Sequence, residues 1–409
     1  MALSSFSGQF AADTADTTTA VTGLGFIPKA IIFFAVDNTT AGLDFAAGNG
    51  GMAVGFTDGT NHSYAGWSGD NNVATTNVGK SYSTTKCIGI MNDGTPTVDN
   101  EATCAFDADG FTLTWNSTPG SAWLIGYWAV GGSDITNVNV GSVAMDTDLG
   151  AQSVTGPAFQ PNIVFIAHTS STAAGTAAGV DFGFGVAVSS SKEACMAVTA
   201  ADGQTMAANI NAESRVSGSN TIIGLANPAI ELAADFTNFT ANGFDINFSD
   251  ASPSAYLFSY LVIKGGQWDC GTSQAPASAT TQSVTGMAFQ PTTMGIFGSQ
   301  ATALDTNTNE AKTAIGAAVS TSTESSCVAR HSETINTAMN RGNENAKILS
   351  LASTVEADFT SFNSDGWTIT WAVDPASRYT GWWAGAGNAA APSGWGGLLS
   401  DQRNRIVQG

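Results

Sequence analysis

The pattern V-T-G-x-x-F-x-P occurs three times in this chain, and this repetition constrains the fold more than any other feature. The copies are VTGLGFIP (residues 21–28), VTGPAFQP (154–161) and VTGMAFQP (284–291). They lie at intervals of about 130 residues. Self-similarity at a near-constant interval indicates repeated structural units, each long enough to bury its own core.

A second pattern, F-x-x-[DN]-G-[FW]-x-[IL]-x-[FW], follows each copy of the first at residues 106–115, 239–248 and 362–371. An aromatic segment that ends in glycine then closes each unit. Because the order and spacing repeat, we predict three tandem homologous domains at residues 1–132, 133–266 and 267–387, followed by a C-terminal tail at 388–409. The polar, glycine-containing stretches at 133–152 and 267–282 are expected to be linkers.

Apolar and polar residues alternate within the second pattern. Phe111, Leu113 and Trp115 point to one face, and Thr112 and Thr114 point to the other. A period of two is typical of a half-buried strand. The preceding Asp-Gly or Asn-Gly pair favours a tight turn. The pattern therefore predicts two strands joined by a turn.

The first pattern ends in proline, and a short apolar run follows each time: KAIIFFAV, NIVFIAHT and TTMGIFGS. Proline at the start of a strand removes no ladder hydrogen bond, and an apolar run suits a central strand that is covered on both faces. No stretch shows the period of a helix. We therefore expect an all-β chain with one antiparallel β-sandwich for each repeat.

The composition excludes some partners. The chain carries 13 Lys and Arg residues, scattered, against 33 Asp and Glu, and a net charge of −20. Nucleic-acid binding requires clustered cations, so none is expected. We interpret the negative charge as a source of solubility. No signal peptide and no spanning helix are expected, because the apolar runs are too short. We expect synthesis in the cytoplasm and no membrane insertion.

Candidates for chemistry are few. The three histidines, His62, His168 and His331, occupy non-equivalent positions, and the five cysteines contain no CxxC pair. We interpret the cysteines as buried thiols, and the acidic loops at 37–44 and 305–310 as solvated turns in preference to calcium sites. The sequence thus predicts no catalytic residue, no metal site and no cofactor, and a protein that is not an enzyme.

The closing segments contain aromatic residues on both faces of an expected strand. Tyr127, Tyr260 and Trp382 recur on one face and are assigned to the core. Trp128 and Trp383 point to the opposite face, where one side of the sheet should be wet. They are candidates for packing between domains or subunits, or for contact with a sugar ring, and packing between domains is the favoured interpretation.

The C-terminal tail differs from the rest of the chain because it combines apolar and basic residues. Trp395 is a further candidate for an interface or a sugar contact. Leu398, Leu399, Arg403 and Arg405 follow it. We interpret this tail as a docking segment for an acidic neighbour in a particle.

Three features together resemble a known group of modules: an F-x-P strand near the start, a DGF turn in the second half, and a closing aromatic strand before glycine. They are similar to the small sandwich modules of H-type lectins and to related repeat modules of bacteriophage tail and head-surface proteins. The resemblance implies a virion component, oligomeric, with host-surface sugars as ligands of some members. No lectin sugar-binding residue matches a position here, so sugar recognition does not carry over.

These observations favour a non-enzymatic bacteriophage virion structural protein, as a head decoration or fibre or as a tail component. Its expected partners are other virion proteins and further copies of itself, with host contact as an additional role. The alternative is a carbohydrate-binding adhesin that recognises a host surface glycan through the same repeats. A third hypothesis, a glycan-cleaving enzyme, would require a close pair of carboxylates.

Overall fold

The computed structural model describes residues 3–44, 51–69, 75–91, 97–204, 212–226, 229–331, 340–352, 355–372 and 376–388. Across these residues the chain forms 33 strands and no helix. All strand pairs are antiparallel, so the chain is all-β, as predicted. No helix in this part of the chain is long and apolar enough to span a membrane.

The first eleven strands form most of one seven-stranded sheet and all of one four-stranded sheet. In spatial order, the larger sheet contains β1 (Ser4–Ala11), β11 (Leu124–Gly131), β3 (Pro28–Ala35), β5 (Gly51–Thr57), β6 (His62–Ser68), β7 (Gly79–Ser83) and β15 (Gly175–Ala178). The smaller sheet contains β2 (Thr18–Thr22), β10 (Gly110–Trp115), β9 (Val98–Asp107) and β8 (Ile88–Met91).

The next eleven strands repeat this order. The second large sheet contains β12 (Asn137–Ala144), β22 (Leu257–Lys264), β14 (Ile163–Thr169), β16 (Val180–Ser189), β17 (Lys192–Ala200), β18 (Glu213–Ser217) and β26 (Thr308–Asn309). The second small sheet contains β13 (Gly150–Val154), β21 (Gly243–Asp250), β20 (Ala229–Thr240) and β19 (Ile222–Ala226).

The last eleven strands repeat the order once more. The third large sheet contains β23 (Gln267–Gln274), β33 (Tyr379–Ala386), β25 (Thr293–Gly298), β27 (Ala311–Ser320), β28 (Thr323–His331), β29 (Asn340–Glu344) and β4 (Gly42–Asp44). The third small sheet contains β24 (Thr281–Val284), β32 (Gly366–Trp371), β31 (Val355–Asn363) and β30 (Leu349–Ala352). We refer to β1–β11, β12–β22 and β23–β33 as the first, second and third strand sets.

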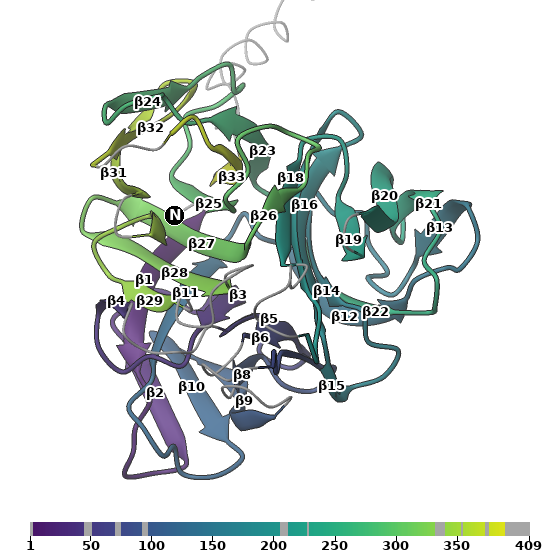
Figure 1. Cartoon of the computed structure of the whole chain (residues 1–409). Helices are drawn as coiled ribbons and strands as arrows, with labels where there is room; N and C mark the ends of the chain where they lie inside the picture. Colours follow the sequence, from purple (N-terminus) through teal and green to yellow (C-terminus); the bar gives the residue numbers. More distant parts are fainter. Residues whose placement is uncertain are drawn as a thin grey trace, which may run out of the picture.

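Each large sheet includes one strand from a different set, and the exchange is cyclic. Strand β15 of the second set pairs with β7 of the first, β26 of the third pairs with β18 of the second, and β4 of the first pairs with β29 of the third. Figure 1 shows the three sets around a common centre, with β26 beside β18 and β4 beside β29. The exchange therefore links every set to both of the others.

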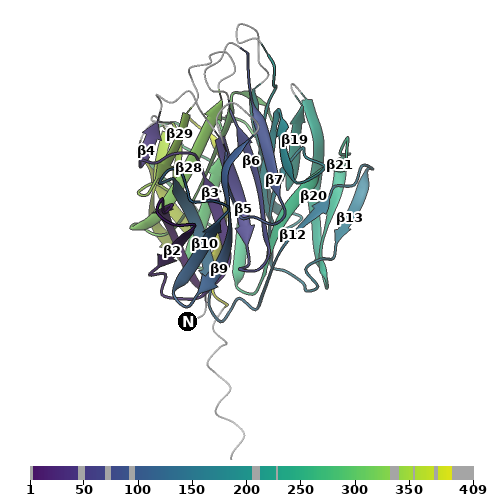
Figure 2. The ribbon, with the colours of Figure 1, turned by 90° about the horizontal axis from the view of Figure 1, so that it is seen from below.

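Two kinds of core hold the sheets together. Within each set the large and small sheets pack face to face over an apolar core, for example around Phe33, Phe111 and Tyr127 in the first. A single larger core lies between the three large sheets, on the faces that point away from the small sheets. In the view of Figure 2, the long strands of these sheets run roughly alongside one another.

The predicted strands recur in the structure. The Asp-Gly and Asn-Gly patterns form the hairpins β9–β10, β20–β21 and β31–β32. Phe111, Leu113 and Trp115 are buried in β10, while Thr114 is exposed. The apolar runs after proline form β3, β14 and β25, which lie inside the large sheets and are buried on both faces. These predictions are confirmed.

The two repeated patterns lie against each other. A Cβ atom on the hairpin glycine would come within 2 Å of the carbonyl oxygen of the valine that opens V-T-G. The glycine–valine pairs are Gly110–Val21, Gly243–Val154 and Gly366–Val284, with Cβ-to-oxygen distances of 1.9, 1.9 and 1.8 Å. Only glycine permits this approach. The patterns recur together because each fixes the position of the other.

Two sequence expectations are wrong. The stretches expected to be linkers contain strands β12, β13, β23 and β24. Strands β12 and β23 are rich in small polar residues because they lie at the outer edge of a large sheet, where a partly exposed side is tolerated. The face of the large sheets that we expected to be wet is buried, because the other two large sheets cover it.

Candidate functional site

The centre of the molecule is an aromatic cluster contributed by all three sets. Trp128 of β11 and Trp383 of β33 meet edge to face, with ring centroids 5.7 Å apart. Phe165 of β14 contacts both indoles, at 5.7 and 5.4 Å between centroids. The indole Nε1 of Trp128 donates to Thr293 Oγ1 at 2.7 Å. The cluster therefore joins the three sets directly.

Two of the site residues predicted from the sequence belong to this buried cluster. Trp128 and Trp383 have no solvent-exposed surface. A buried indole offers no ring face to a sugar in solvent, so the structure contradicts a sugar contact at these two positions. The reason is the packing of the other large sheets on this face, which strand alternation cannot reveal. Trp395 and the docking residues Leu398, Leu399, Arg403 and Arg405 lie outside the described residues.

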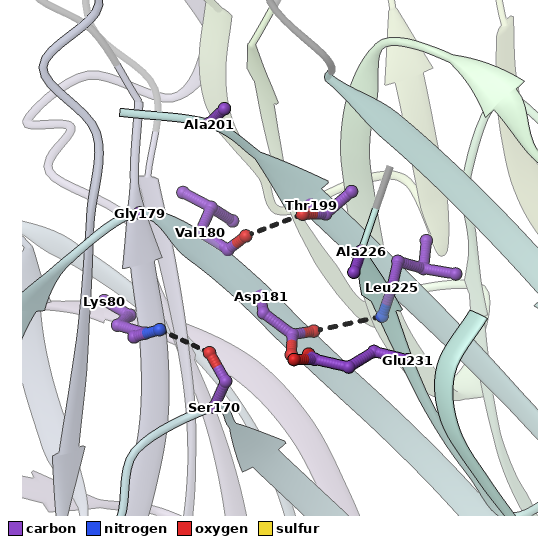
Figure 3. A pocket seen from close by; sticks show the side chains of 10 residues that line it. All are labelled: Lys80, Ser170, Gly179, Val180, Asp181, Thr199, Ala201, Leu225, Ala226 and Glu231. Atoms are coloured by element: carbon purple, nitrogen blue, oxygen red, sulfur yellow. Dashed lines mark hydrogen bonds between the residues drawn. The ribbon is translucent and has the colours of Figure 1, made fainter. Parts of the chain in front are cut away.

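A polar pocket of about 270 Å³ lies where the first and second sets meet. Figure 3 shows Lys80 of β7 facing Asp181 of β16 and Glu231 of β20 across this pocket. Lys80 Nζ donates to Ser170 Oγ. Asp181 Oδ1 accepts from the Leu225 amide at 3.4 Å. Three charged groups from two sets thus converge at one seam.

The protonation of this pocket follows from burial. Burial is the main cause that raises the pKa of Asp181 to about 8; the neighbouring Glu231 charge acts in the same direction, and Lys80 opposes it. Burial also lowers the pKa of Lys80. The other carboxyl oxygen, Asp181 Oδ2, is buried and has no hydrogen-bond partner among the described residues. A proton on Asp181 reduces the negative charge opposite Lys80.

This arrangement is suited to holding a seam. A lysine that faces two carboxyl groups, one of them protonated, is an ion network with little net charge, which is the form in which buried charges are tolerated.

A second pocket, of about 430 Å³, lies between the first set and the start of the second. Lys29 Nζ reaches across it to the carbonyl of Ile135 at 2.6 Å. Asp58 Oδ2 accepts from the Val140 amide at 3.3 Å. Lys29 and Asp58, which line this pocket, are therefore already engaged in joining the two sets.

Two buried glutamates were not found from the sequence. Glu193 accepts from the Phe236 amide, and Glu324 accepts from the Phe359 amide, both at 2.8 Å. Each amide lies beside a β-bulge in the small sheet. Burial raises the pKa of both carboxyl groups to about 7. The sequence signal for these bulges is one extra residue before the hairpin phenylalanine, Phe239 or Phe362, in the second and third repeats.

The remaining chemical candidates are histidines and cysteines, and most of them are buried. Burial lowers the pKa of His168 to about 4 and that of His331 to about 3. The five cysteines are buried and unpaired, as predicted. Among the residues that the structure describes, no group of three or more His, Cys, Asp or Glu side chains could hold a metal ion.

The two acidic loops have a role that the sequence did not reveal. The loop at 37–44 contains β4, and the loop at 305–310 contains β26. Both strands are exchanged between sets, so the interpretation as solvated turns is wrong. Their sequences are short and polar, and their pairing partners are distant in the chain, so no local pattern predicts the pairing.

Comparisons with known proteins assign no family. No protein-family model matches the chain, and no curated protein matches it. Among solved structures, a bacterial polysaccharide outer membrane secretin is matched over 89% of this chain and 99% of that chain, at 10% identity and a TM-score of 0.10. At that TM-score the similarity carries no argument about fold or function.

Proposed function

We propose that the chain consists of three tandem homologous β-sandwich domains and serves as a non-enzymatic structural protein of a bacteriophage virion. The domains correspond to residues 1–132, 133–266 and 267–387. In this proposal the protein is a head decoration or fibre, or a component of the tail. The resemblance of the repeated motifs to phage surface modules motivates the virion assignment.

The cyclic strand exchange is the observation that carries the structural role. The second and third sets each donate one strand to the set before them, and β4 of the first set closes the cycle by pairing in the third. One chain thereby acquires the closed arrangement that a homotrimer obtains from three chains. A body whose parts are interlocked in this way suits a component that must keep its shape on a particle surface.

The proposed partners follow from the same role. Other virion proteins and further copies of this chain would contact the outer sheets, and the tail at 388–409 would dock on an acidic neighbour. The net charge of −20 supports solubility at high concentration before assembly. The adhesin alternative relied on Trp128 and Trp383 as sugar contacts, and both side chains are buried.

Immunogold electron microscopy of purified particles, with an antibody against this chain, tests the proposal. Gold over the head would support decoration or a head fibre. Gold at the tail would support a tail component and make glycan binding the next assay. Particles that carry the chain in immunoblots of the lysate but bind no gold and contain no copy by mass spectrometry would overturn the virion assignment.

A further inference from the structure

A buried lysine of the third set lies against the side-chain amide of a glutamine. Lys312 on β27 is 2% exposed. Its Nζ lies 2.7 Å from Gln300 Oε1 and 3.8 Å from Glu310 Oε2. The amine is therefore held beside a carbonyl group on one side and beside a carboxylate on the other.

The glutamine amide is bound at both of its polar atoms. Gln300 Oε1 also accepts from Arg378 Nη1 at 2.6 Å. Gln300 Nε2 donates to Glu310 Oε2 at 3.1 Å. A guanidinium on the carbonyl oxygen stabilises the negative charge that develops there when a nucleophile adds to the carbon. The carboxylate lies where it can deliver a proton to the amide nitrogen.

The surrounding charges favour the neutral amine. Burial is the main cause that lowers the pKa of Lys312 to about 7; the Glu310 charge opposes it, and Arg330 and Arg378 act in the same direction as burial. Near neutral pH a large fraction of the amine is therefore unprotonated. An unprotonated amine is the nucleophilic form of lysine.

We propose that Lys312 and Gln300 become joined by an intramolecular isopeptide bond. Lys312 Nζ forms a bond to Gln300 Cδ, and the Cδ–Nε2 bond breaks. Glu310 accepts one proton from Nζ and passes it to Nε2, which leaves as ammonia. No atom is oxidised or reduced, and the oxyanion formed on the way is stabilised by Arg378.

The position of this bond gives it a structural consequence. Gln300 and Lys312 flank the segment that carries β26, the strand that pairs with β18 of the second set. A covalent bond between the two residues would close this segment into a loop and restrain the exchanged strand. By strand register the corresponding residues of the second set are Ser170 and Asp181, which supply no amine nucleophile.

Mass spectrometry of the purified full-length protein tests the proposal directly. The denatured protein should be lighter than its sequence by the mass of one ammonia. Trypsin should fail to cleave after Lys312, so that one peptide spans residues 265–330 and yields no backbone fragments between positions 300 and 312. Because the protein is analysed after denaturation, the measurement does not depend on an activity.

Variants separate this bond from other losses of ammonia. Lys312→Met should restore the full mass, and Glu310→Gln should slow bond formation by about 100-fold or more. Lys192→Met, which removes a lysine that pairs with Asp269, should leave the deficit unchanged. Cleavage after Lys312 in the wild-type protein, or a deficit that persists in Lys312→Met, would overturn the proposal.

Discussion

Trp128 and Trp383 meet edge to face at the centre of the molecule, with ring planes inclined by 74°. One comes from the first strand set and the other from the third, and neither is exposed to solvent. The core around this contact contains residues of all three sets, which therefore share one core in addition to their own. Damage at the centre should therefore weaken all three together.

Replacing Trp128 with alanine should lower the free energy of unfolding by about 3–5 kcal/mol, because a large buried side chain leaves a cavity among neighbours that cannot fully collapse. Chemical denaturation followed by circular dichroism measures the change. Ile27→Ala is the matched control, since Ile27 is 57% exposed and should change stability by no more than about 0.5 kcal/mol. A loss for Trp128→Ala as small as the control would contradict the shared core.

Three glycines at corresponding positions should not tolerate alanine. A Cβ on Gly55, Gly185 or Gly316 would lie 1.9–2.0 Å from a backbone carbonyl oxygen of a neighbouring segment. Gly185→Ala should therefore destabilise the protein by about 1–3 kcal/mol or more, because the backbone must shift. Gly120→Ala, where no atom lies within 4 Å, should be nearly neutral. Thermal unfolding of the two variants side by side checks this, and equal melting temperatures would refute the close approach.

Proline in β15 should open the seam between the first two sets. The Gly179 amide donates to the Val78 carbonyl at 2.9 Å, and antiparallel alternation makes Ala177 the next hydrogen-bonded residue of this strand. Ala177→Pro removes that donor. Hydrogen exchange of the β7 amides should become faster, while Ala177→Ser should leave it unchanged. Unaltered protection of β7 in the proline variant would argue against the exchanged pairing.

The stability of the protein should fall between about pH 4 and pH 8 through Asp181. Burial raises the pKa of Asp181 from 3.8 to about 8 in the folded protein, so the folded state holds a proton that the unfolded state has lost. Stability then decreases with rising pH across this window. Asp181→Asn should flatten the profile of unfolding free energy against pH. An identical slope in both proteins would show that Asp181 does not hold the proton.

The local parts of the fold could be predicted from sequence. The hairpin β9–β10 follows from alternating residues and a turn signal that lie within a few positions of each other, and the burial of Leu113 and Trp115 follows from the same alternation. The buried run of β3 is also local. Local residue patterns therefore predict these strands and the burial of their apolar side chains.

The seams between sets could not be predicted in this way. Strands β4, β15 and β26 read GLD, GTAA and TN, and their partners are far away in the chain. The ion network of Lys80, Asp181 and Glu231 combines three strands whose approach depends on the packing of two sets. Strand alternation placed Trp128 on the second face of β11, but only the arrangement of the other sheets determines what covers that face.

The pairing of β4 with β29 also constrains the order in which the strands can pair during synthesis. Strand β4 comprises Gly42–Asp44, whereas β29 comprises Asn340–Glu344, so this pair can form only after β29 has been synthesised. Contacts of such long sequence separation are entropically expensive and slow to form. During synthesis, β4 of the first set therefore has no partner strand until β29 of the third set has left the ribosome.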